Sequence, residues 1–392
     1  MPRICFVSNS AWSVYNFRID IIRHFISKGY EILVLAADDE YAARLRQEGC
    51  RFVPVSFNNR TENPFTDYLL YRNLKKLYKE YQPDIIFHYV IKPNIYGSLA
   101  AASRHIPSIA VITGMGYGFS KRNWLYLLIR LLYTHALKKT KVVWFLNNED
   151  AKFFIEQKIV NVEKTRVLHG EGVNTTHFAP VNRPTGKNKF RFLMSTRLLK
   201  SKGVAIYADA ARILRKKNID ADFELIGFYE KHHPDSIHPQ DIMRWQSEGL
   251  IRYSGFANDV RIFLSAADGF IFPSFYNEGV PRGLMEAASM QLPVITSNNR
   301  GCREVVIDNV TGYLCNMNNP FDLADKMEKM INLSNDEKIK MGVNGRLLVE
   351  NKFNIQQVIE VYEQALQFQS QHFDYDSENS RAMQQIDGKS GN

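Results

Sequence analysis

The feature that most constrains this chain is an alternation of short apolar runs with segments of helical spacing, which occurs in both halves of the sequence. Residues 17–28 and 66–81, for example, repeat apolar side chains at helical intervals between such runs. Strands that alternate with amphipathic helices predict an α/β architecture with a doubly wound parallel sheet and right-handed crossovers in each half. The expected strands are residues 4–7, 32–35, 52–55, 85–87, 109–112 and 142–145, and then 190–194, 223–226, 251–253, 269–272 and 294–296.

The chain has 392 residues, more than one hydrophobic core usually supports, so two domains are expected. We place them at 1–170 and 171–352, followed by a helix at 353–370 and a polar, disordered tail at 371–392. The four cysteines are scattered and form no C-x-x-C pair, which favours a reducing compartment. We expect no signal peptide, and no uncharged apolar run reaches the roughly 18 residues that a membrane-spanning helix needs.

The formal net charge of +9 is unevenly distributed, because residues 1–170 alone carry +10. Such an excess suggests that this half faces a polyanion, either an anionic membrane or nucleic acid. A nucleic-acid-binding protein should contain a recognisable reading module, and we identify none. Residues 121–141 hold six basic and no acidic side chains around an apolar stretch that Arg130 interrupts. They predict a helix in the headgroup plane of a membrane, although a core helix with basic ends would have the same composition.

The segment 271–304 combines a buried strand, a turn and a helix that begins near Pro281, where the fixed φ of proline suits a first helical position. The backbone N–H groups at this helix start have no partner within the helix, so they can bind an anion. Glu278 lies in the turn before the helix, and Glu286 lies more than one turn inside it. Two carboxylates that bind hydroxyls on either side of an anion match the chemical outline of a nucleotide sugar.

This E-x₇-E pattern resembles that of the retaining glycosyltransferases of family four, which are two-domain enzymes of the GT-B fold. Gly279, Pro281, Pro293, Gly301 and Glu304 also fall at the offsets of that family. The resemblance covers residues 1–370 and is strongest over 190–315. It implies two Rossmann-like domains that face each other across a cleft, a UDP-sugar donor, no cofactor and no essential metal.

The resemblance also assigns roles on the donor side. Arg197 and Lys202 match the R-x₄-K-G of the family, whose two cations meet the donor diphosphate and stabilise the charge that develops on departing UDP. Glu278 would contact the transferred sugar, and Glu286 the ribose hydroxyls. The remaining donor-binding residues expected are Gly279, Val280 and Pro281 at the helix start, with Ser254 and Asp259 in a loop beside the uracil base.

Ligands of doubly wound sheets lie at the carboxyl ends of the strands, which directs attention to the loops 8–17, 89–96 and 113–119. The first lacks the G-x-G-x-x-G of dinucleotide-binding proteins, so a dehydrogenase is disfavoured. Its residues could contact an acceptor sugar, although a polar loop with Trp12 packed on its own domain would explain the sequence equally well. The candidates in and just after this loop are Asn9, Tyr15 and Arg18.

In the second loop, Lys92 could meet an acceptor phosphate or could be an ordinary surface lysine. In the third, Gly114 and Gly116 permit close backbone approach to a ligand, or simply form a tight turn. This chain departs from the family pattern in three places. It lacks the Gly-Gly pair of the first loop and the histidine expected at 113–119, and it has Asn174 in place of the usual aspartate.

The segments SNSAWSVYNFR, IKPNIYGSLAA and TGMGY resemble the branch of the family that extends glycans on polyprenyl-diphosphate carriers. The resemblance therefore implies transfer of a hexose or N-acetylhexosamine from a UDP-sugar to a polyprenyl-diphosphate-linked saccharide, with retention of configuration. The enzyme would be cytoplasmic and peripherally bound to the inner face of the membrane. A GT-B-fold UDP-sugar 2-epimerase is the alternative. We interpret His169 and His177 as structural, and the D-x-D sequences at 220–222 and 374–376 as unrelated to metal binding.

Overall fold

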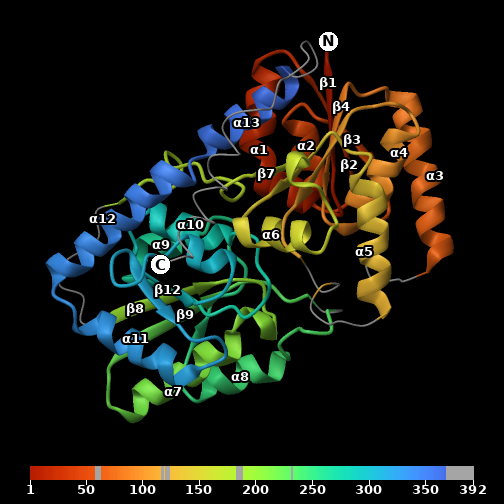
Figure 1. Cartoon of the computed structure of the whole chain (residues 1–392). Coiled ribbons are helices and arrows are strands. Elements are labelled where there is room, and N and C mark those ends of the chain that lie inside the picture. The colour runs from red at the N-terminus through yellow and green to blue at the C-terminus, as the bar shows by residue number, and fades with distance from the viewer. Residues whose placement is uncertain (58–62, 116–118, 120–123, 182–188, 231–232, 368–392) are drawn as a thin grey trace, which may run out of the picture. The chain divides into compact units, whose positions relative to one another are not determined.

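The computed structural model describes residues 1–57, 63–115, 119, 124–181, 189–230 and 233–367. Residues 1–358 form one compact unit that holds two sheets, and a second unit begins at residue 359. In the first unit, helices cover both faces of each sheet (Figure 1). Both sheets are entirely parallel within the described residues.

The first sheet has the strand order β3-β2-β1-β4-β5-β6-β7, so the direction of winding reverses between β1 and β4. Its central strands are apolar and fully buried, as expected where helices cover both faces. The strands are β1 (Arg3–Val7), β2 (Glu31–Ala36), β3 (Arg51–Pro54), β4 (Ile85–Tyr89), β5 (Ser108–Ile112), β6 (Val142–Phe145) and β7 (Thr165–Val167).

The helices of this part begin at polar caps, since the side chains of Ser10, Asn63 and Asn147 accept backbone N–H bonds at the starts of α1, α3 and α6. The elements are α1 (Ala11–Ser27), α2 (Tyr41–Gln47), α3 (Pro64–Tyr81), the π-helical turn η1 (Pro93–Gly97), α4 (Ser98–Ala102), α5 (Trp124–Leu137), α6 (Asn148–Glu156) and the 3₁₀ turn η3 (Val162–Lys164).

The second sheet has the order β10-β9-β8-β11-β12-β13. Its strands are β8 (Phe190–Ser195), β9 (Ala221–Ile226), β10 (Arg252–Tyr253), β11 (Gly269–Phe272), β12 (Val294–Ser297) and β13 (Gly312–Cys315). The helical elements are η4 (Lys200–Lys202), α7 (Val204–Lys216), α8 (Pro239–Ser247), α9 (Arg261–Ala266), α10 (Arg282–Ser289), η5 (Gly301–Glu304), α11 (Pro320–Asn332), α12 (Asn335–Lys352) and α13 (Ile355–Gln367).

Every strand expected from the sequence is present, so the prediction of two α/β halves with parallel sheets is confirmed. Two further strands, β7 and β13, were not predicted, and both lie at sheet edges. Pro281 is the N-cap of α10 rather than its first helical residue, with an extended ψ of 122°. The domain boundaries at residues 170 and 352 stay predictions, as does the helix at 353–370. The tail at 371–392 lies outside the described residues.

His88 is one of several buried polar groups in the first half of the chain. His88, at β4, is completely buried between the Tyr78 hydroxyl at 2.9 Å and the Ser98 hydroxyl at 3.3 Å. Burial lowers the pKa of His88 to about 3, so its imidazole is neutral. A neutral, hydrogen-bonded imidazole in this position serves a structural role. In the part of the chain that the structure describes, no helix combines the length and apolarity that crossing a membrane requires.

Candidate active site

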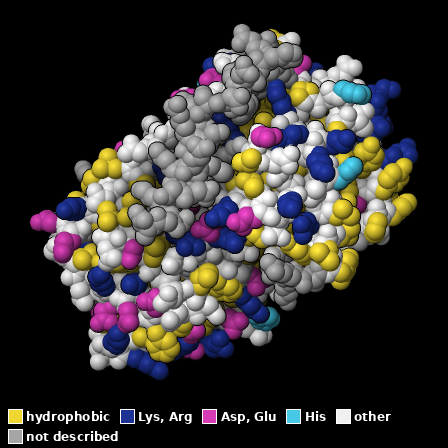
Figure 2. Space-filling view, viewed as in Figure 1, with side chains coloured by type: hydrophobic (Ala, Val, Ile, Leu, Met, Phe, Trp, Pro, Cys, Tyr) yellow, Lys and Arg dark blue, Asp and Glu magenta, His cyan; other side chains and the backbone are white. Residues whose placement is uncertain are grey.

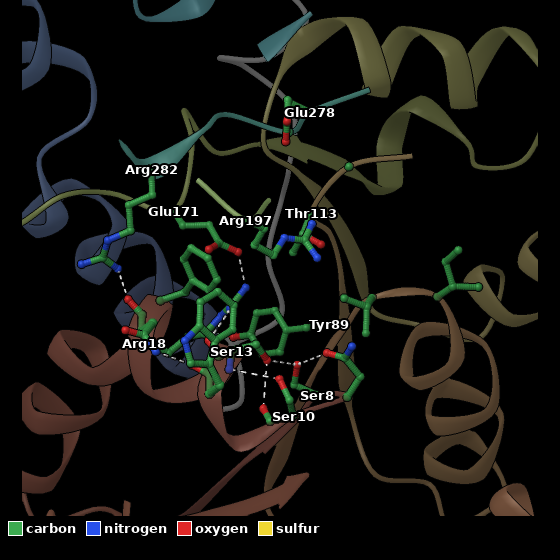
Figure 3. Close-up of a pocket in the computed structure, with 18 of the residues that line it drawn as sticks. Ser8, Ser10, Ser13, Arg18, Tyr89, Thr113, Glu171, Arg197, Glu278 and Arg282 are labelled. Carbon is green, nitrogen blue, oxygen red and sulfur yellow. Dashed lines mark hydrogen bonds and ion pairs between the residues drawn. The ribbon is translucent and has the colours of Figure 1, made fainter. Parts of the chain in front are cut away.

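A cavity of about 2770 Å³ lies at the carboxyl ends of strands from both sheets. Ser8 and Thr113, just after β1 and β5, line it from the first half of the chain. Arg197 and Glu278, which follow β8 and β11, line it from the second half. Figure 3 shows these four residues around the same space. The position is the one expected for the ligand of an open parallel sheet.

Lys202 and Glu278 form a buried ion pair in this cavity. Their side chains are only 9% and 11% exposed, and the Ser274 hydroxyl donates to the same carboxylate at 2.7 Å. The Lys202 ammonium also lies 5.1 Å from the centre of the Tyr276 ring. Gly203 ends the η4 turn at φ +82°, where an added Cβ would overlap the Pro273 carbonyl. The backbone therefore packs closely at the point where it presents this lysine.

Arg197 and Glu230 supply a second ion pair, at 2.7 Å, and both line the cavity. Arg197 follows β8, and Glu230 follows the neighbouring strand β9. The structure thus brings the two predicted cations, Arg197 and Lys202, to one wall of the cavity. Glu230 and Ser274 were missed in the sequence analysis, although a carboxylate shortly after a strand was a signal that could have identified Glu230.

Three glycines hold the loop before α10 against its surroundings. A Cβ on Gly279 would overlap the Thr113 carbonyl, and one on Gly301, which has φ +43°, would overlap the Gly279 carbonyl. Gly114 has φ +139°, and a Cβ there would lie 3.1 Å from the Gly279 nitrogen. The Asn147 side-chain amide donates to the Gly279 carbonyl at 3.1 Å. The first half of the chain therefore fixes the backbone at the start of α10.

Glu286 lies on α10 and pairs with Arg282 at 2.8 Å. Arg282 also donates to the Asn16 carbonyl in α1, which links the two halves beside the cavity. Val280, Pro281 and Glu286 all line the cavity, and their donor-side roles stay predictions.

Asp259 lines the cavity and pairs with Arg261 at 2.6 Å. Hydrogen bonds from Arg261 lower the pKa of the Asp259 carboxyl, which stays ionised at neutral pH. Ser254 is placed differently. Its hydroxyl donates to the buried Glu224 carboxylate, and it is absent from the cavity lining. The role predicted for Ser254 beside a base stays a prediction, and in this structure its hydroxyl satisfies a buried acid.

The acceptor-side candidate Arg18 is buried against Glu171, and both line the cavity (Figure 3). The Arg18 guanidinium lies 4.0 Å from the centre of the Tyr89 ring and donates to the Ser13 carbonyl at 3.0 Å. Burial raises the pKa of the Glu171 carboxyl, and the charges of Arg18 and Arg282 oppose this rise. Glu171 was not singled out in the sequence analysis, because its partner is 153 positions away.

Asn9 and Tyr15 also line the cavity. Trp12 was expected to pack on its own domain or to contact a sugar. It contacts Phe17 of its own half, with ring centres 5.5 Å apart, and Phe228 of the second half at 6.0 Å. The ring therefore touches both sides of the cavity.

Lys92 forms an ion pair with Asp67 at 2.7 Å, and the Tyr96 hydroxyl donates to the same carboxylate at 2.8 Å. All three residues line the cavity. Lys92 is thus a largely buried, paired residue of the cavity wall. Gly114 lines the cavity as well, whereas Gly116 lies outside the described residues.

Within the described ranges, no cluster of histidine, cysteine, aspartate and glutamate side chains has the arrangement of a metal site. Asp220, from one D-x-D sequence, pairs with Lys189 at 2.9 Å and Arg215 at 3.2 Å. The other such sequence, at 374–376, lies outside the described residues. The ring of His177 lies 3.3 Å from the Arg261 guanidinium.

Comparison with known families identifies the chain. The profile described as glycosyl transferases group 1 matches residues 176–348, and the profile described as glycosyl transferase 4-like matches residues 3–147. The chain belongs to the group 1 glycosyltransferases of family four. The recognition made from the E-x₇-E pattern is therefore confirmed, and the protein is a glycosyltransferase.

Two curated relatives of this glycosyltransferase extend along most of its length. It is 27% identical over 358 residues to the N,N'-diacetylbacillosaminyl-diphospho-undecaprenol alpha-1,3-N-acetylgalactosaminyltransferase of Campylobacter jejuni, covering 87% of this chain and 92% of that protein. It is 29% identical over 296 residues to the UDP-Gal:alpha-D-GlcNAc-diphosphoundecaprenol alpha-1,3-galactosyltransferase of Escherichia coli, covering 72% of this chain and 75% of that protein.

Solved structures support the fold assignment. A glycosyltransferase from Rickettsia africae superposes with a TM-score of 0.78 at 20% identity, covering 93% of this chain and 98% of the other. Anabaena HepE in complex with UDP-glucose superposes with a TM-score of 0.76 at 18% identity, covering 93% and 99%. The GT-B fold predicted for the glycosyltransferase is confirmed.

Proposed function

We propose that this glycosyltransferase transfers a hexose or N-acetylhexosamine from a UDP-sugar to a saccharide carried on a polyprenyl diphosphate, with retention of configuration. The observation that carries the proposal is the convergence of Arg197, Lys202 and Glu278 at the start of α10, inside one large cavity. The acceptor class is supported by the names of the two curated relatives, which both act on undecaprenyl-diphosphate-linked sugars. The product would enter a bacterial surface polysaccharide or a related glycan.

On the donor side, Lys202 and Arg197 would offset the negative charge that develops on the β-phosphate as UDP departs. The backbone N–H groups at Gly279 and Val280 precede α10, where an anion is stabilised by unpaired donors. Lys202 is paired with Glu278. Donor binding would separate this pair, so that Lys202 meets phosphate and Glu278 accepts hydrogen bonds from the transferred sugar. Glu286 would bind the ribose hydroxyls.

A mechanism in which departure and attack occur on the same face of the sugar would account for retention. Glu171 and Glu230 line the cavity, and each is paired with an arginine, which makes its carboxylate a poorer nucleophile. The acceptor hydroxyl would approach from the first half of the chain, where Asn9, Tyr15, Arg18 and Gly114 line the cavity. We therefore assign acceptor binding to residues 1–170 and donor binding to residues 171–352.

Membrane contact would bring this acceptor domain to a lipid-linked substrate on the cytoplasmic face. The α5 helix exposes apolar side chains, among them Trp124 at 64% and Leu127 at 61%. Figure 2 shows hydrophobic and basic side chains intermingled on the side of the molecule where Figure 1 places this helix. An amphipathic cationic helix binds an anionic membrane surface through burial of its apolar side chains and through electrostatic attraction to the lipid headgroups. Sedimentation with phosphatidylglycerol vesicles but not with phosphatidylcholine vesicles is expected, and equal recovery with both would contradict anionic recognition.

The deciding experiment measures UDP release from a panel of UDP-hexoses and UDP-N-acetylhexosamines, with and without polyprenyl-diphosphate-sugar acceptors, in detergent with EDTA. Acceptor-dependent release from one donor would support the transferase reaction, identify the donor and support independence from metal ions. Sugar conversion without acceptor would replace the proposal with a UDP-sugar 2-epimerase. No release from any donor, in the presence of a folded protein, would refute the proposed substrate class.

A further inference from the structure

The cavity does not end at the donor site. It continues along the first half of the chain as a groove with η1 and α4 as its floor, and α3 and α5 supply lining residues on either side. The helix packing agrees with this arrangement, because η1 packs against both α3 and α5. The groove is lined mainly by apolar and aromatic side chains, including Tyr68, Tyr71, Ile95, Leu99, Leu128 and Leu132.

The polar groups of this groove are placed unevenly along its length. At the end that opens into the cleft lies the Lys92–Asp67 ion pair with the Tyr96 hydroxyl. At the far end lie His135 and Lys139, near the carboxyl end of α5. Among the described residues that line the groove, Asp67 is the one acidic side chain, and it is neutralised by its partner. The groove therefore offers apolar surface between the Lys92–Asp67 ion pair at one end and Lys139 at the other.

One face of α5 lines the groove, and another face of the same helix lies on the outer surface. Leu128 lines the cavity and is 40% exposed, whereas Leu131, one turn further on, is 67% exposed and does not line it. The residues of α5 that line the groove run from Leu125 to His135, and these ten helical steps extend over about 15 Å at the rise of an α-helix. This length accommodates a few isoprene units in an extended conformation.

We propose that this groove binds the first isoprene units of the polyprenyl acceptor, with the acceptor diphosphate at Lys92 and the sugar in the cleft. The proposal rests on the proposed function and specifies how the lipid part of that substrate is held. Three features support it: the groove is continuous with the cleft, its walls are apolar, and its cleft end carries Lys92, whose partner Asp67 the diphosphate would replace. Burial of each further isoprene unit would tighten binding, since affinity follows the apolar area removed from water.

The test uses N-acetylglucosaminyl diphosphates with tails of one, two, three or four isoprene units, below their micelle concentrations and without detergent or vesicles. Binding is measured by calorimetry, and KM is measured by UDP release. For the unaltered enzyme, the dissociation constant and KM are expected to fall about tenfold or more between one and three units. In Leu128→Gln the difference in dissociation constant and KM between one and three units should shrink to about threefold or less. Leu131→Gln, a matched change on the same helix, should retain it.

Equal affinity for all tails in the unaltered enzyme would refute binding of the isoprene units in the groove. An equal loss of tail-length dependence in the two variants would also refute it, because it would indicate that the tail contacts the outer face of α5 instead. The two proposals can fail separately. Tail-dependent binding without sugar transfer would keep the groove and refute the proposed transfer to these acceptors, whereas transfer that ignores tail length would keep the proposed acceptor class and refute the groove.

Discussion

Replacing Lys202 by alanine tests the donor site most directly. The ammonium is buried with Glu278 and is therefore weakly screened by solvent. Removing a fixed cation from a developing phosphate charge costs roughly 10²–10³ in kcat. Loss of one partner of a buried ion pair also destabilises a fold, by about 3 kcal/mol. We expect destabilisation no larger than this value, because the Ser274 hydroxyl still donates a hydrogen bond to the Glu278 carboxylate.

The assay is acceptor-dependent UDP release at saturating donor, paired with thermal unfolding. Lys200→Ala is the matched control, because Lys200 is exposed in the same η4 turn and does not line the cavity. The double change Lys202→Ala with Glu278→Gln removes the unpaired buried charge, so it should recover stability but not turnover. A kcat for Lys202→Ala within about threefold of the Lys200→Ala value would refute leaving-group stabilisation by this lysine.

Two further predictions concern the scaffold. Gly301→Ala places a Cβ onto the Gly279 carbonyl, so it should lower both the melting temperature and the turnover. Gly249→Ala, also at positive φ but with open space around it, should cost only about 1 kcal/mol of backbone strain and leave turnover intact, and equal effects would contradict the steric argument. Burial holds the pKa of His88 at about 3 in the folded protein, below its value of about 6.5 in the unfolded chain. The free energy of unfolding that neutral His88 contributes is therefore fully present above about pH 6.5. It falls as the pH drops, by up to about 1.4 kcal/mol per pH unit. His88→Gln should flatten this decline in melting temperature between pH 6.5 and 4, and an unchanged slope would show that other groups cause it.

The fold could be predicted because its signals are local. The continuous apolar runs at 85–87 and 109–112 identify buried strands without reference to the rest of the chain. The strands β7 and β13 were missed because edge strands are short and contain polar or glycine residues, as Thr165, Arg166 and Gly312 show. Nothing in such segments distinguishes them from loops until a neighbouring strand pairs with them.

The donor site was predictable for a similar reason, since Glu278, Glu286 and the start of α10 lie within one short segment. The partners of these groups were not predictable. Arg18 meets Glu171, and Arg282 meets the Asn16 carbonyl, through contacts that span 153 and 266 positions. Ser254 fits the family spacing, yet its hydroxyl is taken by Glu224, a partner that only the packing of β9 and the following loop determines.

The glycine contact between the two halves has a consequence for recombination among related enzymes. A chimera joined near residue 170 would combine an acceptor half from one parent with a donor half from another. A side chain at position 114 would place its Cβ 3.1 Å from the Gly279 nitrogen and 3.3 Å from the Asn277 carbonyl oxygen, at a φ that only glycine adopts readily. Parents that lack glycine there would push the donor loop away from its place, even with every donor residue present. Glycine at this position is therefore one requirement for exchanged halves to work together.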